Sequence, residues 1–140
     1  MSSLVYGDTR IDRWVAERLG LRPWPISYSI ANVRDNLILG ATVFHNYYPE
    51  AGVIELTSAS ESPRWMDRNM INAVFSHAFD ALKCQLVVLR VSEINTRMVN
   101  IAKGLGFQGY LIPRLRGKTE AEWIMTLTDD DWRNSRFRRT

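Results

Sequence analysis

Two predominantly apolar runs, at residues 52–56 and 86–91, are each followed by a segment whose apolar residues recur at helical spacing. This order predicts two parallel strands that are joined through a helix and buried in a sheet. Ligands bind in the crevice beyond the carboxyl ends of such strands. The loop at residues 58–65 is polar and carries Arg64 just before the predicted helix, a position that favours phosphate. We therefore expect a phosphate-bearing ligand at this edge of the sheet.

The length of 140 residues and the hydrophobic fraction of 46% predict a single domain, residues 1–140, with a substantial core. No stretch reaches the roughly 20 apolar residues that span a bilayer, and the N-terminus lacks the features of a signal peptide. We therefore expect a cytoplasmic protein that does not enter a membrane. The single cysteine, Cys84, has no neighbouring metal ligands, so we interpret it as a buried hydrophobic residue and predict no metal site.

The formal net charge of +3 suits an anionic ligand but does not identify nucleic acid. Much of the excess comes from Arg133, Arg136, Arg138 and Arg139, which follow three aspartates at residues 129–131. An acidic start and a basic finish complement the dipole of a short terminal helix. The same arginines also suit an electrostatic contact with RNA, DNA or an acidic protein, and both interpretations stay open.

The remaining elements follow from spacing and turn residues. Helices are predicted at residues 9–19, 66–82 and 96–105, and strands at 26–33, 37–48, 53–58, 86–91, 107–112 and 122–127. Asp8 or Thr9 can cap the first helix, and Gly20 ends it. Three strands thus precede the long helix. The pattern predicts a mixed α/β domain whose central sheet has about six strands flanked by helices.

Two segments of the sequence resemble a known protein family. Residues 91–107, VSEINTRMVNIAKGLGF, resemble the asparagine, helix and "LGF" ending of the GNAT family of N-acetyltransferases, and residues 64–79, RWMDRNMINAVFSHAF, look like its acetyl-CoA helix. The latter segment is especially similar to the branch close to enzymes that acetylate ribosomal-protein amino termini. The resemblance implies a GNAT-like acyl-CoA N-acyltransferase fold, acetyl-CoA as cosubstrate, and acetyl transfer to a primary amine by direct attack in a ternary complex. The acceptor is a protein amino terminus, a small molecule or a modified nucleotide.

The resemblance also implies a set of site residues. Glu55 and Asn95 are the catalytic candidates, with Glu55 as the base. The residues implied to bind the cofactor are Leu56, Thr57, Ser58, Arg64, Trp65, Met66, Asp67, Arg68, Asn69, Asn95, Met98 and Ala102. Two features depart from the family pattern. Residues 62–67 lack the glycines of the phosphate loop, and Ala102 occupies the position of the tyrosine that often protonates the departing thiolate.

Several of these residues have a second interpretation. Glu55 can be an exposed position of an alternating strand, and Asp67 and Asn95 can cap helices. Trp65 can be a hydrophobic staple or a lid over the pantetheine rather than a catalytic residue. His45, Trp24, Tyr47, Tyr48 and the basic loop at 114–118 are candidates for the acceptor groove. A sheet edge near residues 122–127 could form a homodimer. The alternative function is a non-catalytic acyl-CoA-binding or nucleic-acid-associated module on the same fold.

Overall fold

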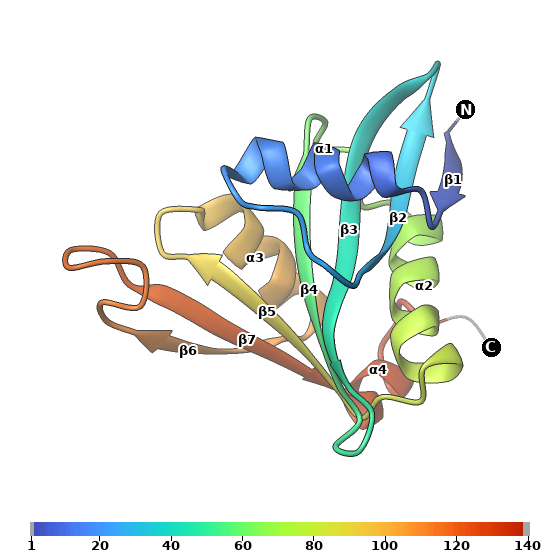
Figure 1. Cartoon of the computed structure of the whole chain (residues 1–140). Coiled ribbons are helices and arrows are strands. Elements are labelled where there is room, and N and C mark those ends of the chain that lie inside the picture. Colours follow the sequence, from blue (N-terminus) through green and yellow to red (C-terminus); the bar gives the residue numbers. More distant parts are fainter. Residues whose placement is uncertain (1, 139–140) are drawn as a thin grey trace.

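A computed structural model describes residues 2–138 and contains one seven-stranded sheet with the order β1-β2-β3-β4-β5-β7-β6 (Figure 1). The strands are β1 (Ser3–Tyr6), β2 (Tyr28–Arg34), β3 (Leu37–Tyr48), β4 (Val53–Ser60), β5 (Leu86–Ser92), β6 (Gln108–Ile112) and β7 (Glu122–Thr128). The helical elements are α1 (Thr9–Leu19), α2 (Arg68–Ser76), the π-helical turn η1 (His77–Ala81), α3 (Thr96–Leu105) and α4 (Asp129–Arg133). The predicted fold class, a mixed α/β domain with a flanked central sheet, is confirmed.

Two strand predictions need correction. Four strands rather than three precede α2, because β1 pairs antiparallel with β2 from Ser3↔Val33 to Tyr6↔Ile30. In addition, the predicted edge at residues 122–127 is wrong, since β7 lies between β5 and β6. The edge strand on this side of the sheet is β6, and all five of its residues are exposed. A dimer formed through residues 122–127 is therefore blocked by β6.

The helix boundaries follow from capping groups. The Asp8 carboxylate accepts from the Arg10 amide at the start of α1, and Gly20 ends that helix with a left-handed φ of 67°. Asp67 accepts from the Met70 amide and caps α2, so this helix begins two residues later than predicted. Its last part is π-helical, with the Leu82 amide donating to the His77 carbonyl over 2.9 Å.

The helices cover the two faces of the sheet. On one face, α1 packs through Ile11 and Val15 against the small residues Ala31, Ala41 and Val43. On the other face, α2, η1 and α3 form the larger core, which includes Ile54, Leu56, Val87 and Leu89 of the two apolar runs, and the buried Cys84. Because side chains alternate along a strand, the intervening residues of β4 and β5 project toward the face that carries α1.

The parallel pair of strands diverges partway along its length. β4 and β5 pair from Val53↔Leu86 to Leu56↔Leu89, and the ladder ends there. β4 continues to Ser60 alongside β3, while β5 continues to Ser92 alongside β7. The divergence is visible in Figure 1 as a widening separation between the two strands, with α3 behind it. The facing backbone groups of residues 57–60 and 90–92 therefore have no partner in a β4–β5 ladder.

The C-terminal segment packs on the rest of the domain. Arg133 Nη1 donates to Asp129 Oδ2 over 3.0 Å within α4, and the carbonyls of Arg136 and Phe137 accept from the side chains of Arg68 and Asn72. These contacts agree with the structural interpretation of the basic segment, although Arg139 lies outside the described residues. Within residues 2–138, no helix is both long enough and apolar enough to cross a membrane.

Candidate active site

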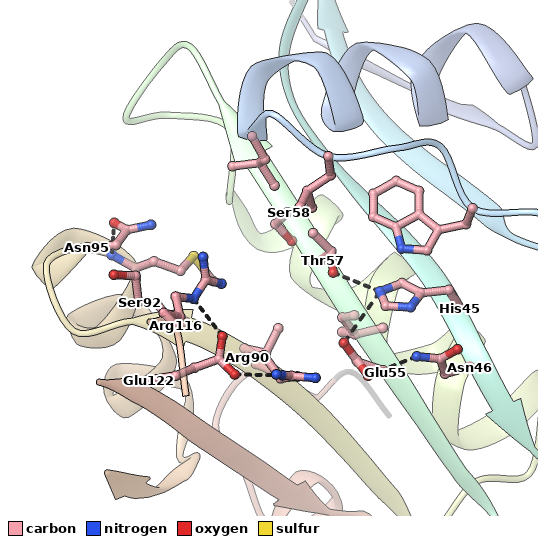
Figure 2. A pocket seen from close by; sticks show the side chains of 17 residues that line it. His45, Asn46, Glu55, Thr57, Ser58, Arg90, Ser92, Asn95, Arg116 and Glu122 are labelled. Carbon is pink, nitrogen blue, oxygen red and sulfur yellow. Dashed lines mark hydrogen bonds and ion pairs between the residues drawn. The ribbon is translucent and has the colours of Figure 1, made fainter. Parts of the chain in front are cut away.

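A cleft of about 410 Å³ lies where β4 and β5 diverge (Figure 2). Its lining combines residues 55–58 of β4, 89–92 of β5, and Asn95 and Met98 at the start of α3. The remaining lining residues are Leu19, Leu21, Trp24, His45, Asn46, Arg116 and Glu122. The cleft therefore occupies the place predicted for a ligand, beyond the carboxyl ends of the parallel strands.

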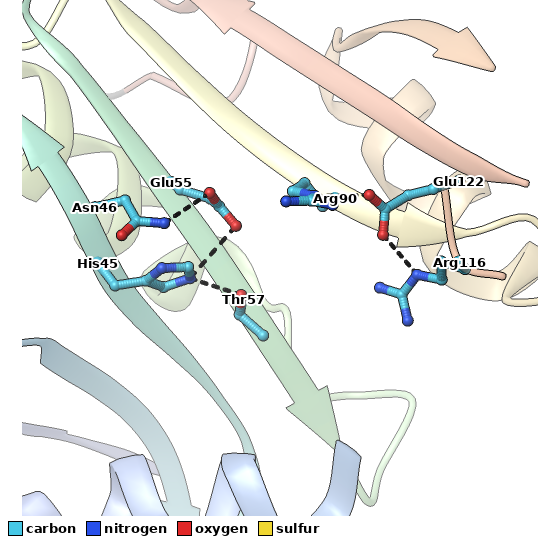
Figure 3. Close-up of polar contacts among 7 residues, drawn as sticks. All are labelled: His45, Asn46, Glu55, Thr57, Arg90, Arg116 and Glu122. Carbon is cyan, nitrogen blue, oxygen red and sulfur yellow. Dashed lines mark hydrogen bonds and ion pairs between the residues drawn. The ribbon is translucent and has the colours of Figure 1, made fainter. Parts of the chain in front are cut away.

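One side of the cleft, here named the carboxylate wall, consists of His45, Asn46, Glu55 and Thr57 (Figure 3). Glu55 lies opposite His45 in the β3–β4 register. Asn46 Nδ2 donates to Glu55 Oε1 over 3.1 Å, and His45 Nε2 lies 2.7 Å from Thr57 Oγ1 and 3.8 Å from Glu55 Oε2. The Glu55 side chain is 19% exposed, so its carboxylate is held by neighbours but still reaches the cleft.

The position of His45 depends on an irregularity in β3. The register shifts between His45 and Tyr48, and Asn46 adopts a left-handed φ of 51°, which asparagine tolerates better than most residues. Trp24 stacks on the His45 ring with 5.0 Å between ring centroids. Burial lowers the pKa of His45 below its usual range, and the nearby Glu55 carboxylate opposes this shift. His45 is therefore neutral near pH 7.

The opposite side of the cleft, here named the arginine wall, consists of Arg90, Arg116 and Glu122 (Figure 3). Arg90 Nε donates to Glu122 Oε1 and Arg116 Nε donates to Glu122 Oε2, each over 2.6 Å. The Glu122 side chain is 3% exposed, whereas the Arg90 and Arg116 side chains are 44% and 39% exposed. One buried carboxylate thus fixes two guanidinium groups at the cleft surface.

The start of α2, predicted to receive phosphate, lies outside this cleft. Asp67 Oδ1 accepts from the Met70 amide, and Asp67 Oδ2 accepts from Asn32 Nδ2 over 3.2 Å. The side chains of Arg64, Arg68 and Asn69 are exposed, and the N–H groups of the first turn of a helix carry positive potential. Asp67 thus caps α2, as one of its two interpretations predicts, and it also places a negative charge at this helix start.

The predicted site residues separate into three groups. Glu55, Leu56, Thr57, Ser58, Asn95 and Met98 lie together in the cleft. Arg64, Met66, Asp67, Arg68 and Asn69 lie at or just before the start of α2. Trp65 and Ala102 are buried at 2% and 0% exposure in the larger core. Asn95 also caps α3, since its Oδ1 accepts from the Met98 amide over 3.2 Å.

Sequence reasoning missed the arginine wall as a unit. Arg90 interrupts the apolar run at 86–91 just as Glu55 interrupts the run at 52–56, and this shared signal could have identified it. Of the basic loop proposed for the acceptor groove, Arg116 lines the cleft. Nothing in the local pattern distinguishes Glu122, because its role arises from the β5–β7 register, in which it pairs with Ser92.

A second cavity of about 700 Å³ adjoins the cleft and is mostly apolar. It is lined by Trp24–Tyr28, Phe44, His45, Asn46, Tyr47, Pro49, Ile54, His77 and Leu82. Trp24, His45 and Asn46 line both spaces. The stacked Trp24 and His45 rings therefore lie at the boundary between the cleft and the second cavity.

Comparison with known proteins gives agreement in structure without agreement in sequence. No protein-family model matches the chain, and no curated protein matches it. The spermidine/spermine N-acetyltransferase SpeG from Vibrio cholerae superposes with a TM-score of 0.76 at 12% identity, covering 96% of this chain and 98% of that chain. A candidate acetyltransferase from T. thermophilus gives a TM-score of 0.68 at 19% identity, covering 85% of this chain and 68% of that chain. A SpeG structure described as dodecameric gives 0.74 at 12% identity, covering 95% and 96%.

These neighbours are GNAT-type acetyltransferases, and the chain has their fold. In this chain that fold is a mixed sheet with flanking helices, and the parallel pair β4–β5 lies within the sheet. At 12–19% identity the likeness concerns the fold. The chemistry must therefore be argued from the residues of the cleft.

Proposed function

We propose that this protein is an acetyl-CoA-dependent N-acetyltransferase that acetylates a primary amine by direct attack in a ternary complex. The observation that carries the proposal is the cleft between the diverging strands β4 and β5, with the Glu55 carboxylate on its wall, in a fold shared with acetyltransferases. The cytoplasm is the compartment that we propose for this reaction.

The chain offers fitting partners for acetyl-CoA at two places. The unpaired edge of β4 at residues 57–60 can exchange hydrogen bonds with the amide groups of a pantetheine arm, as a neighbouring strand would. Leu56, Met98 and the Ser58 hydroxyl line the same space. The amides at the start of α2, together with Arg64 and Arg68, provide donors and positive charge for a pyrophosphate, and Asp67 partly opposes them.

Three of the predicted cofactor residues support the site indirectly. Trp65 packs beneath the start of α2, where it contacts the position of Gly40, and Ala102 is the α3 residue that packs fully into the larger core. Met66 is partly buried against the same core. We propose that these residues hold the two helix starts in place, while Asn69, exposed at the first turn of α2, is available to the phosphates.

Bound acetyl-CoA supplies an electrophilic thioester carbon, to which the amine nitrogen adds as the bond to sulfur breaks. Glu55 takes the proton that the amine nitrogen must lose, because its carboxylate reaches the cleft and is held by Asn46. His45 is neutral and 3.8 Å from Glu55, so it can share that proton. Asn95 is placed at the cleft to bind the pantetheine or a water molecule. The position of the usual tyrosine acid is the buried Ala102, so the thiolate takes its proton from water.

The test is incubation with acetyl-CoA and a panel of amines and amino-terminal peptides, with free thiol as the readout. Release that depends on the acceptor is expected. Tight binding of CoA in calorimetry without such release would instead support the non-catalytic acyl-CoA-binding module. Absence of both binding and release would overturn the assignment to either class.

The role of Glu55 gives the sharpest mutational prediction. Glu55→Gln should lower kcat by about 100-fold or more, the usual contribution of a general base, with little change in the Kd for CoA. Glu50→Gln is the matched control, because Glu50 is exposed in the turn before β4 and does not line the cleft. Unchanged turnover in Glu55→Gln would remove Glu55 from the reaction.

A further inference from the structure

We infer that the acceptor is zwitterionic: its amine faces Glu55, and a carboxylate or phosphate elsewhere on the same molecule binds the terminal guanidinium nitrogens of Arg90 and Arg116. This inference rests on the proposed function and names the chemical class of the acceptor. It depends on the charges that the two walls of the cleft present.

The two guanidinium groups of the arginine wall retain unused hydrogen-bond donors. Arg90 and Arg116 each use the Nε–H group to bind Glu122. Within residues 2–138, no hydrogen bond from the terminal nitrogens of either residue is found, and both side chains are more than one third exposed. A guanidinium has five N–H donors in a fixed planar arrangement, and it matches carboxylate and phosphate oxygens. Two such groups on one wall form a preorganised anion site.

The charge of Glu122 does not cancel this site. Both of its carboxylate oxygens are occupied by the arginine Nε atoms, and its side chain is almost fully buried. One negative charge against two positive charges leaves the arginine wall with a net charge of about +1. Glu122 therefore orients the two guanidinium groups, and both oxygens of its carboxylate are already paired with arginine.

The arginine wall also lies on the wrong face of the sheet to bind the phosphates of CoA. Val87, Leu89 and Val91 of β5 project into the core beneath α2 and α3, so Arg90 projects toward the face that carries α1. The start of α2, which we propose for the pyrophosphate, belongs to the opposite face. The two arginines are thus free for a second molecule that enters from the α1 side.

The opposing wall selects a cation. Among the described residues that line the cleft, Glu55 is the carboxylate with no arginine partner, and it shares its wall with the neutral His45. A protonated amine is attracted to Glu55 before it loses its proton there. Figure 3 shows the Glu55 and Glu122–Arg116 groups on opposite sides of the cleft, with Arg90 between them. An acceptor with an amine and an anionic group satisfies both walls, whereas a polycation such as spermidine places positive charge against two arginines.

The experiment compares matched amines at saturating acetyl-CoA, with thiol release as the readout. The pairs are phenylalanine against phenylalaninamide, for a carboxylate, and phosphoethanolamine against ethanolamine, for a phosphate; spermidine is the cationic probe. We expect kcat/KM for the anionic member of at least one pair to exceed that of its neutral partner by about tenfold or more, as charge-assisted hydrogen bonds allow. Preference for the neutral members or for spermidine would overturn the inference and leave the proposed function standing. Release with none of these probes, if peptides or other amines do cause release, would also overturn it.

Variants assign the preference to the arginines. Arg90→Gln and Arg116→Gln should each reduce the ratio of kcat/KM between the anionic and neutral amines by about fivefold or more, through the acceptor KM, without raising the KM for acetyl-CoA. Arg114→Lys, from the same loop as Arg116 but outside the cleft, should leave the ratio unchanged. If the glutamine variants do not fold, Arg116→Lys keeps a cation beside Glu122 but lacks the planar donor group, and it should lower the ratio as well. An unchanged ratio, or an effect confined to acetyl-CoA, would contradict the inference.

Discussion

At the scale of single residues, the titration of His77 offers a check on the structure that does not depend on activity. The His77 ring stacks on Tyr28 and meets the edge of Phe44, with 4.7 Å between ring centroids in both cases. Burial lowers the pKa of His77, so the folded protein favours the neutral ring. The unfolded chain therefore binds more protons below about pH 6.5, the ordinary pKa of histidine.

It follows that the stabilisation from neutral His77 is complete above about pH 6.5 and is lost as the pH falls toward the lowered pKa of the folded state. His45 contributes in the same direction, because its pKa is also lowered. His77→Phe should lose less free energy of unfolding between pH 7.5 and pH 5.5 than the unmodified protein does. Urea denaturation at the two pH values measures this difference, and equal losses would show that His77 does not titrate with folding.

The residue scale also shows where sequence reasoning reaches its limit. Glu55 was a candidate because an unpaired carboxylate is costly to bury in an apolar strand, and the structure places it at the cleft. Arg90 is likewise a charged residue within an apolar strand, and it also lies at the cleft. By contrast, Glu122 and Arg116 meet through the return of the chain from β6 to β7, and no local pattern encodes that contact. His45 reaches Glu55 through the irregular register of β3, which composition does not reveal.

At the scale of elements, the sequence predicted the helices whose ends are fixed by capping residues close to them in the chain. Asp8, Asp67 and Asn95 are all observed as caps, and Gly20 and Gly106 end their helices with left-handed φ values. The strand β1 escaped prediction because four residues carry too short a pattern, and its hydrogen bonds exist through pairing with β2. The apolar runs predict the two parallel strands, whereas the seven-strand order required the structure.

Two glycines in different elements should respond in opposite ways to the same substitution. In β3, a Cβ atom at Gly40 would lie 2.5 Å from the buried ring of Trp65, so Gly40→Ala should destabilise the protein by about 1–3 kcal/mol. In α3, a Cβ atom at Gly104 meets nothing within 4 Å. Gly104→Ala should stabilise the protein by about 0.5–1 kcal/mol, because alanine favours a helix interior.

Urea denaturation of both variants measures these two effects. A neutral Gly40→Ala would show that Trp65 does not pack against β3. Since Trp65 precedes α2, the same variant also reports how firmly the start of that helix is held. Gly104→Ala controls for the general effect of glycine removal on the unfolded chain.

At the scale of the whole molecule, the two faces of the sheet carry different parts of the candidate site. The face beneath α2 and α3 carries the larger apolar core and the helix starts that we propose for the coenzyme. The face beneath α1 carries the charged side chains of the cleft. Both ends of the described chain return to α2, since Ser2 Oγ donates to Asp67 and the Phe137 carbonyl accepts from Asn72. The helix that bears the proposed phosphate site is thus fixed from both termini.

The Trp24 indole lines both the cleft and the adjoining cavity, so under the proposed function this residue should influence which acceptors fit. The indole lies at the boundary together with His45, so Trp24→Ala should widen the connection between the cleft of about 410 Å³ and the adjoining cavity of about 700 Å³. We expect this variant to gain kcat/KM for amines with bulky aromatic substituents relative to small ones. Trp14→Ala, an equal truncation outside both spaces, should leave that relation unchanged. In the N-acetyltransferase that we propose, the largest amine accepted would then depend on the Trp24 ring.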